Sequence, residues 1–174
     1  PLLRQQCVYK CLKSITLNSN RFGVRGLKAL VRGLALLPNL EALDIGTYKS
    51  TADMGELPNH FDEPGALNLL DELIRGPHVF GYPKLKVLQM DTCHISINDL
   101  LVLSYSLLKN RTLWHVIWHQ PIDVQRDERV SLAFDMVQRQ MEKNRSYVVN
   151  KEMIRKMKHG PDVEDIDSMY RLRM

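Results

Sequence analysis

The side chains of this 174-residue chain that could bind a metal ion or move a proton are few and far apart. His115 and His119 are separated by four positions in a segment predicted below to be a strand, which places them roughly 13 Å apart. Zinc binds each of its ligands at about 2 Å, so these two histidines cannot share one zinc ion.

The three cysteines are the other possible metal ligands. Cys7 and Cys11 lie four residues apart in a predicted helix, and Cys93 with His94 could complete a set of four. Nothing in the spacing makes these groups converge, so we favour buried, small apolar cysteines and expect no metal and no cofactor. So small and odd a set also favours a reducing, intracellular compartment, cytoplasmic or organellar.

One sequence motif of spaced apolar residues, called a phrase below, recurs along the chain. Its complete form is Leu12-x-x-Ile15-x-Leu17-x-x-Asn20-x-Phe22, and related phrases begin at Leu40, Leu85 and Leu113. The first two starts are 28 residues apart, and so are the last two, whereas Leu40 and Leu85 are 45 apart, which is 28 plus an insertion of 17. Such self-similarity at a fixed period is typical of repeat architectures.

Each phrase predicts a short strand followed by a helix. Alternate residues of the phrase point inward, as in a strand with one buried face, and apolar residues then recur at helical spacing over 24–37, 96–108 and 130–141. Ser96 and Asp99 have the spacing of a capping box. Such units in series predict parallel strands joined by right-handed crossovers, stacked into a curved solenoid.

On these residues the chain resembles the leucine-rich-repeat family, in its ribonuclease-inhibitor-like class of 28-residue units. The resemblance covers roughly residues 1–145 and implies a right-handed α/β solenoid with short parallel strands on the concave side and helices on the convex side. We assign residues 1–145 to about four units, with the insertion within 46–84, and residues 146–174 to a C-terminal capping helix and charged tail.

Two features depart from a regular array. The family's asparagine position is held by Asn20, Tyr48, Cys93 and Pro121 in successive units, so we expect an incomplete asparagine ladder. Residues 1–11 have the apolar pattern of the helix of a preceding unit, which makes the first strand an exposed edge. Because such edges are normally covered, we expect upstream chain or a partner there.

The outward positions of the fourth strand form the first candidate binding surface. Trp114, His115, Ile117 and His119 combine apolar area with polar tips, as interface anchors do. Alignment of the units places Asp91 beside His119, which predicts a carboxylate–imidazole pair that raises the pKa of the histidine. No nucleophile accompanies this pair, so we expect no catalytic residues. The alternative is that the C-terminal cap covers this strand.

The insertion provides the second candidate surface. Its loop-like sequence carries Tyr48 and Phe61, and the loop after the next helix carries Phe80 and Tyr82. We predict that these aromatic side chains anchor a partner near one rim of the sheet. The alternative is a packed excursion that binds nothing.

A short basic segment accounts for the whole net charge of +4. Between residues 139 and 158 two glutamates are outnumbered by seven cations, namely Arg139, Lys143, Arg145, Lys151, Arg155, Lys156 and Lys158. Three interpretations are open: a capping helix that docks Val149, Met153 and Met157, a basic helix that binds phosphates or an acidic protein, and a helix on a membrane surface. No apolar run approaches the roughly 20 residues of a membrane span.

These features predict a non-catalytic protein–protein interaction module, a scaffold, adaptor or structural subunit of a larger intracellular assembly. Other proteins in a multi-subunit complex are the expected partners. The alternative function is an RNA-contacting component of a ribonucleoprotein complex, which would use the basic segment 139–158 and bind with a strong dependence on salt.

Overall fold

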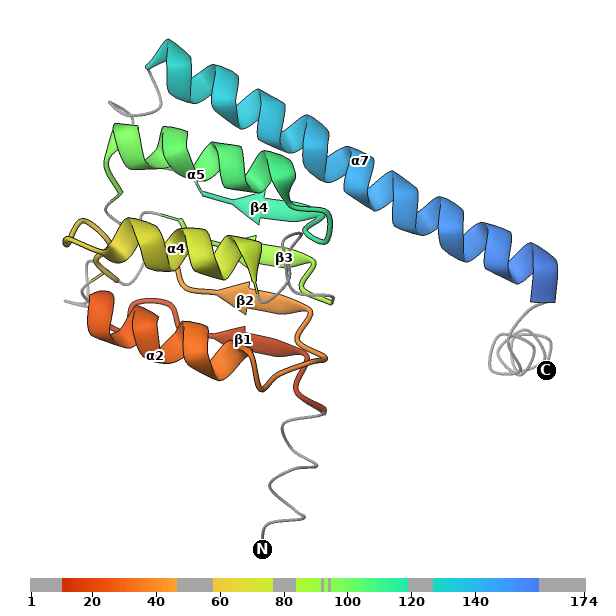
Figure 1. Ribbon diagram of the computed structural model, residues 1–174, viewed down its shortest axis with the longest axis horizontal. Helices are drawn as coiled ribbons and strands as arrows, with labels where there is room; N and C mark the ends of the chain where they lie inside the picture. Colours follow the sequence, from red (N-terminus) through yellow and green to blue (C-terminus); the bar gives the residue numbers. More distant parts are fainter. Residues whose placement is uncertain are drawn as a thin grey trace, which may run out of the picture.

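Strands and helices alternate along the chain in the computed structural model, which describes residues 11–46, 58–76, 84–91, 93, 95–118 and 127–159, with side chains up to residue 155 (Figure 1). In chain order the elements are β1 (Ser14–Thr16), α2 (Val24–Leu34), β2 (Ala42–Asp44), α4 (Ala66–Arg75), β3 (Val87–Gln89), α5 (Ile97–Lys109), β4 (His115–Ile117) and α7 (Glu128–His159). Each strand therefore falls within one of the four apolar phrases.

The four strands form one parallel sheet in the order β1-β2-β3-β4, so neighbours in sequence are neighbours in space. The central residues Ile15, Leu43, Leu88 and Val116 are in register across the sheet. Leu43, Leu88 and Val116 are fully buried, whereas Ile15 in the edge strand β1 is partly buried. The prediction of an α/β fold with parallel strands is confirmed.

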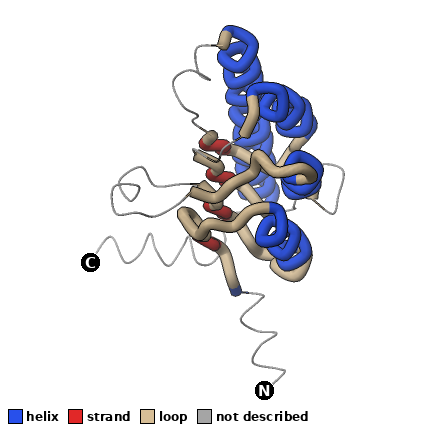
Figure 2. The backbone as a smooth tube through the Cα atoms, turned by 90° about the vertical axis from the view of Figure 1, so that its left-hand side faces the viewer, coloured by secondary structure: helices blue, strands red, loops and turns tan. Residues whose placement is uncertain are grey.

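The helices form a second layer on one side of the sheet (Figure 2). α2 packs against α4, α4 against α5, and α5 against α7. Their inward side chains, such as Leu27, Leu70 and Leu103, join the central strand residues in one core. No described helix or strand covers the other side of the sheet, which we call the open face (Figure 2).

α5 begins where the sequence predicts. The Ser96 hydroxyl accepts the Asp99 backbone N–H at 3.2 Å and caps the helix. Leu101 and Leu108, which helical spacing predicts to be buried, are only half-buried, because they border a surface groove between α5 and α7.

α7 begins at an acidic cap and crosses the expected domain boundary without a break. The Asp127 carboxylate accepts the Arg129 backbone N–H at 2.9 Å, and the Arg129 guanidinium lowers the pKa of this carboxyl to about 2. Val130, Val137 and Met141 are buried, as predicted. The helix then continues through residue 145, where the repeat domain was expected to end, so no change of secondary structure marks that boundary.

α7 is long enough to cross a bilayer, because 32 residues exceed the roughly 20 that are needed. Its length is interrupted by charged side chains throughout. Within the described ranges, no helix combines the length and the apolar character of a membrane span.

Candidate functional site

The strand register places the outward side chains of all four strands side by side on the open face. One row crosses the sheet through Ser14, Ala42, Val87 and His115, and the next through Thr16, Asp44, Gln89 and Ile117. Strand alternation within each phrase predicts that these positions face outward. The face changes from small and polar at β1 to larger and more apolar at β4.

Charged side chains just before β1, β2 and β3, at the strand entries, contact one another in a row that ends at Trp114. Glu41 accepts a hydrogen bond from Lys86 at 2.9 Å and pairs with Lys13 at 3.6 Å. The hydrogen bond and charge of Lys86 lower the pKa of Glu41, and Lys13 adds to this effect. Lys86 Nζ also lies 4.9 Å from the centre of the Trp114 ring, so a cation–π contact orients the indole.

β4 and α7 enclose a shallow pocket of about 300 Å³ beside the predicted anchors. Its lining includes His115, Ile117, Phe134 and Gln138. Phe134 stacks on the buried Trp118 with ring centres 4.6 Å apart, which fixes the floor. α7 therefore borders β4, yet His115 stays exposed and Ile117 half-buried. The last helix therefore packs beside this strand but does not cover His115, and partner binding by the strand stays a prediction.

The edge of β4 is capped by a side chain. Gln138 Nε2 donates to the Val116 carbonyl oxygen at 3.3 Å. Because β4 is the last strand of the sheet, this carbonyl has no further described strand to pair with. The amide of Gln138 supplies the missing donor.

At the strand exits the open face becomes polar. Asp44 accepts hydrogen bonds from Asn18 Nδ2 at 3.1 Å and from the Gly46 N–H at 2.9 Å, and Gln89 donates to Asp91 at 3.2 Å. A Cβ atom at Gly46 would lie 2.9 Å from the Asp91 nitrogen, so only glycine fits here. His119, the predicted partner of Asp91, lies outside the described residues.

Asn59, and not Tyr48, occupies the asparagine position of the second unit. This fully buried amide donates to the carbonyl oxygens of Leu17 at 3.0 Å and Ile45 at 2.8 Å, and it accepts the N–H groups of Asn20 and Phe22. The next rung is the Cys93 thiol, 3.2 Å from the same Ile45 oxygen.

A repeated tripeptide could have revealed this residue. Asn59-His60-Phe61 has the pattern of Asn20-Arg21-Phe22 and also precedes a helix, by seven residues where Asn20 precedes α2 by four. The alignment without a gap assigned the position to Tyr48, because most of the insertion lies between Ile45 and Asn59. Tyr48, Phe80, Tyr82 and Pro121 lie outside the described residues.

The structure corrects the expectation for Phe61. Its side chain is 2% exposed and packs against Phe22, with ring centres 5.7 Å apart. It corresponds to Phe22 of the first phrase, so the ring belongs to the core and is unavailable as a surface anchor. Cys93 is buried as expected, but Cys11 is exposed, contrary to expectation.

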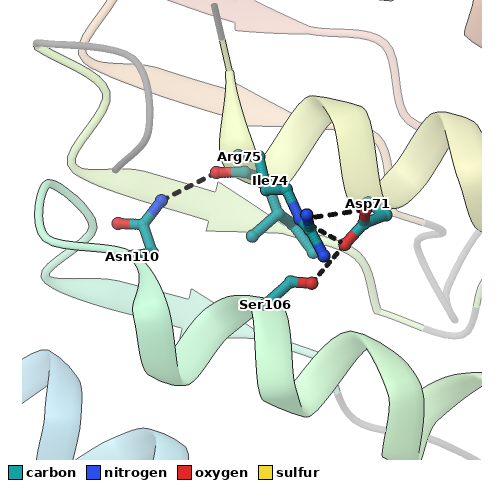
Figure 3. A network of polar contacts seen from close by, with 5 residues as sticks. All are labelled: Asp71, Ile74, Arg75, Ser106 and Asn110. Carbon is teal, nitrogen blue, oxygen red and sulfur yellow. Dashed lines mark hydrogen bonds and ion pairs between the residues drawn. The ribbon is translucent and has the colours of Figure 1, made fainter. Parts of the chain in front are cut away.

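A second ladder ties the helix ends to the strand entries. Asn110 Nδ2 donates to the Ile74 carbonyl oxygen at 2.8 Å (Figure 3). Asn144 Nδ2 then donates to the Asn110 and Leu113 carbonyl oxygens at 3.0 and 2.9 Å. Both asparagines are buried. Each occurs in an Asn-Arg-Thr or Asn-Arg-Ser sequence, so α7 is attached by the same device that joins α5 to α4.

The α4–α5 contact has a further polar tie. The Ser106 hydroxyl donates to the Asp71 carboxylate, which also pairs with Arg75 at 3.0 Å (Figure 3). These contacts hold the helical layer beneath the open face in a fixed arrangement.

The outer side of the helical layer carries exposed apolar residues that are not among the predicted site residues. A groove of about 290 Å³ between α5 and α7 is lined in part by Tyr105, Leu132 and Met136. Tyr105 is 68% exposed and Leu132 63%. Leu132 and Met136 are four residues apart, and this helical spacing could have indicated an apolar stripe on the outer side of α7.

The basic segment is exposed wherever its side chains are described, at Arg139, Lys143, Arg145, Lys151 and Arg155. Lys156 and Lys158 lie on α7, but their side chains are outside the described set. Two of the three docking residues proposed for a capping helix are not buried, since Val149 is 44% and Met153 49% exposed, and the side chain of Met157 is outside the described set. This half of α7 therefore does not cap the described sheet.

The described residues bring together no group of three or more His, Cys, Asp or Glu side chains that could hold a metal ion. The buried Cys93 thiol has a raised pKa, because burial and the nearby carboxylates of Asp91 and Asp44 disfavour the thiolate. This thiol is thus a poor nucleophile in the folded protein.

In comparisons with known proteins, no family model matches the chain and no curated protein sequence matches it. The arrangement of side chains on the fold is therefore the basis for a functional proposal.

Proposed function

We propose that the chain is a leucine-rich-repeat solenoid module of the 28-residue class that acts as a non-catalytic protein–protein interaction surface. Three observations support the repeat assignment: the in-register parallel strands, the helix that follows each phrase, and the ladder through Asn59 and Cys93. In such a solenoid the open face would be the concave side.

The observation that carries the functional proposal is the position of His115 and Ile117 on β4, where they line a pocket together with Phe134 and Gln138. Trp114 directly precedes the strand and contacts Lys86 at the strand entry. A partner side chain that enters this pocket would bury apolar area against Ile117 and Phe134. The imidazole of His115 offers a hydrogen bond at the rim. Interface anchors combine apolar area with a polar tip in this way.

Rigidity favours recognition by shape. Lys86 holds the Trp114 ring, the strand register fixes His115 and Ile117, and Asn144 attaches α7 behind them. A preformed surface of this kind loses little conformational entropy when a partner binds. This property suits a scaffold, an adaptor or a subunit of a larger assembly.

Comparative affinity purification tests the proposal. The full chain and its Trp114→Ala variant would be used as baits in a lysate of the source cells, with mass spectrometry of the retained proteins. We expect the variant to lose at least one protein that the parent retains. Leu36→Ala is the matched control, because Leu36 is 68% exposed and follows α2, away from β4. Identical recoveries for Trp114→Ala and the parent would contradict an open-face binding site.

RNA binding through α7 is the second candidate function, and the exposure of its cations favours it. At about 100° per residue, however, Arg139, Lys143, Arg145, Lys151 and Arg155 are distributed around the helix, not along one line. Phosphate contacts would make binding fall steeply with salt. Filter binding of an RNA oligonucleotide between about 50 and 200 mM salt separates this function from a protein interface, which persists over that range.

A further inference from the structure

The second half of α7 presents an apolar face that the described body does not cover. In the first half, Val137, Met141 and Asn144 form a buried line along the helix. The same line continues into the exposed Lys151 and Arg155. We call residues 145–155 the distal helix; in Figure 1 it extends past the sheet and the other helices.

Four of the five apolar residues of the distal helix lie on the side opposite to that buried line, and the fifth, Val148, lies on the line and is half-buried. At about 100° per residue, Tyr147, Val149, Met153 and Ile154 occupy a sector of about 160°, centred roughly half a turn from Val137 and Met141. All four are between 44% and 68% exposed. Docking on the protein's own sheet therefore cannot bury this face, because the line that docks lies on the other side of the helix.

Cations border this apolar face on both sides. By the same helical spacing Arg145 lies next to Val149, and Lys151 lies next to Tyr147 and Ile154. Between residues 143 and 155 the chain has four cations and one acidic residue, Glu152. An apolar stripe flanked by positive charge complements an amphipathic helix whose stripe is flanked by carboxylates.

The position of Asn150 distinguishes among the surfaces that this face could meet. Asn150 is exposed and lies in the middle of the apolar sector, next to the small and exposed Ser146. A lipid phase would leave its amide without hydrogen-bond partners, which opposes insertion. A helix–helix interface accepts a single asparagine at a core position and uses it to fix register. Nucleic acid would require the cations on one side and would leave the apolar face exposed.

We propose that the distal helix binds an acidic amphipathic helix of another protein, with Tyr147, Met153 and Ile154 packed against the apolar stripe of that helix. Arg145 and Lys151 pair with its flanking carboxylates. A second copy of this chain does not fit, because it would bring the same cations face to face. This surface is separate from the open face.

The test uses the full chain and a synthetic amphipathic peptide of about three heptads, with leucine at the core positions and glutamate at the flanking ones. We expect fluorescence anisotropy to detect binding of this peptide and at least tenfold weaker binding of a version with lysine in place of glutamate. Ile154→Ser should weaken binding about tenfold, as expected for the loss of one buried branched side chain.

Two control variants separate this surface from the rest of the molecule. Leu36→Ser removes an equally exposed apolar side chain elsewhere and should leave peptide binding unchanged. Trp114→Ala should also leave it unchanged, because Trp114 lies at the entry to β4. Circular dichroism should show the same helix content for all variants, since Ile154 contributes nothing to the core.

Three outcomes would overturn the proposal. The first is equal affinity of the acidic and basic peptides, or of Ile154→Ser and the parent. The second is Ile154-dependent binding to vesicles of phosphatidylserine and phosphatidylcholine without peptide binding, which would assign the face to a membrane. The third is self-association in sedimentation equilibrium that Ile154→Ser abolishes, which would assign it to a second copy.

Discussion

Asn59 reaches back across the insertion to donate its amide to the carbonyl oxygen of Ile45 at 2.8 Å, although fourteen positions separate the two residues in the chain. The same side chain joins the exit of β1 to that of β2 through Leu17. A loop that interrupts the repeat phrase is thus closed by the residue that the phrase requires.

Replacement of Asn59 by alanine should destabilise the protein strongly. The change leaves the buried groups that Asn59 satisfies without partners, including the carbonyl oxygens of Leu17 and Ile45. We expect the free energy of unfolding to fall by about 3 kcal/mol or more, measured by urea denaturation. Asn68→Ala on the exposed side of α4 is the control and should change it by less than about 0.5 kcal/mol. A small effect at Asn59 would show that the ladder is not structural.

Asn144→Ala should loosen the attachment of α7. Its amide is buried and donates to the Asn110 and Leu113 carbonyl oxygens, so its removal should cost about 2 kcal/mol. Asn150→Ala provides a matched comparison, because Asn150 is exposed on the same helix. Hydrogen exchange should report faster opening of α7 only for the first variant. Equal protection in the two variants would contradict an attachment role for Asn144.

The row of charged residues at the strand entries should lower the pKa of Glu41. Lys86, followed by Lys13, holds the pKa of Glu41 below its ordinary value of 4.5. A carboxylate with a lowered pKa adds stability above its unfolded pKa, and that stability is lost as the pH falls through the folded pKa. NMR titration of the Glu41 carboxyl should show the lowered value, and Lys86→Met should raise it toward 4.5. Lys84→Met, which removes an exposed neighbouring cation, should have much less effect. A titration unchanged by Lys86→Met would exclude the contact as the cause.

The two described cysteines should differ in reactivity. Cys11 is exposed, whereas Cys93 is buried and its pKa is raised by desolvation and by Asp91 and Asp44. Iodoacetamide at mildly alkaline pH should modify Cys11 in the folded protein and reach Cys93 only after unfolding, because the thiolate is the nucleophile. Peptide mass mapping distinguishes the two sites. Modification of both at similar rates under native conditions would mean that Cys93 is more accessible than its burial indicates.

Secondary-structure elements that form through local sequence signals could be predicted. The apolar phrases locate all four strands because a leucine or its equivalent must occupy each inward position. Ser96 marks the start of α5 because its cap involves residues only three positions apart. Side chains at the outward positions, such as His115 and Ile117, follow from strand alternation alone.

Features that depend on contacts between distant segments could not be predicted in this way. Asn59 takes its place only when the insertion is closed, and a sequence alignment without gaps assigns that place to Tyr48. Phe61 becomes a core residue for the same reason. Whether the basic segment docks on the body of the protein depends on which side of α7 contacts α5 and β4. The apolar spacing of Val149 and Met153 does not indicate which side that is, and both residues are exposed.

The capping of Val116 by Gln138 bears on how this molecule can join others. A side-chain amide takes the hydrogen-bonding site that an incoming polypeptide backbone would need, and α7 packs along β4. The β4 edge of the sheet is therefore protected against the addition of a strand from another chain. A partner at β4 must therefore bind through side-chain contacts. Polymerisation of the chain by strand addition at the β4 edge is disfavoured.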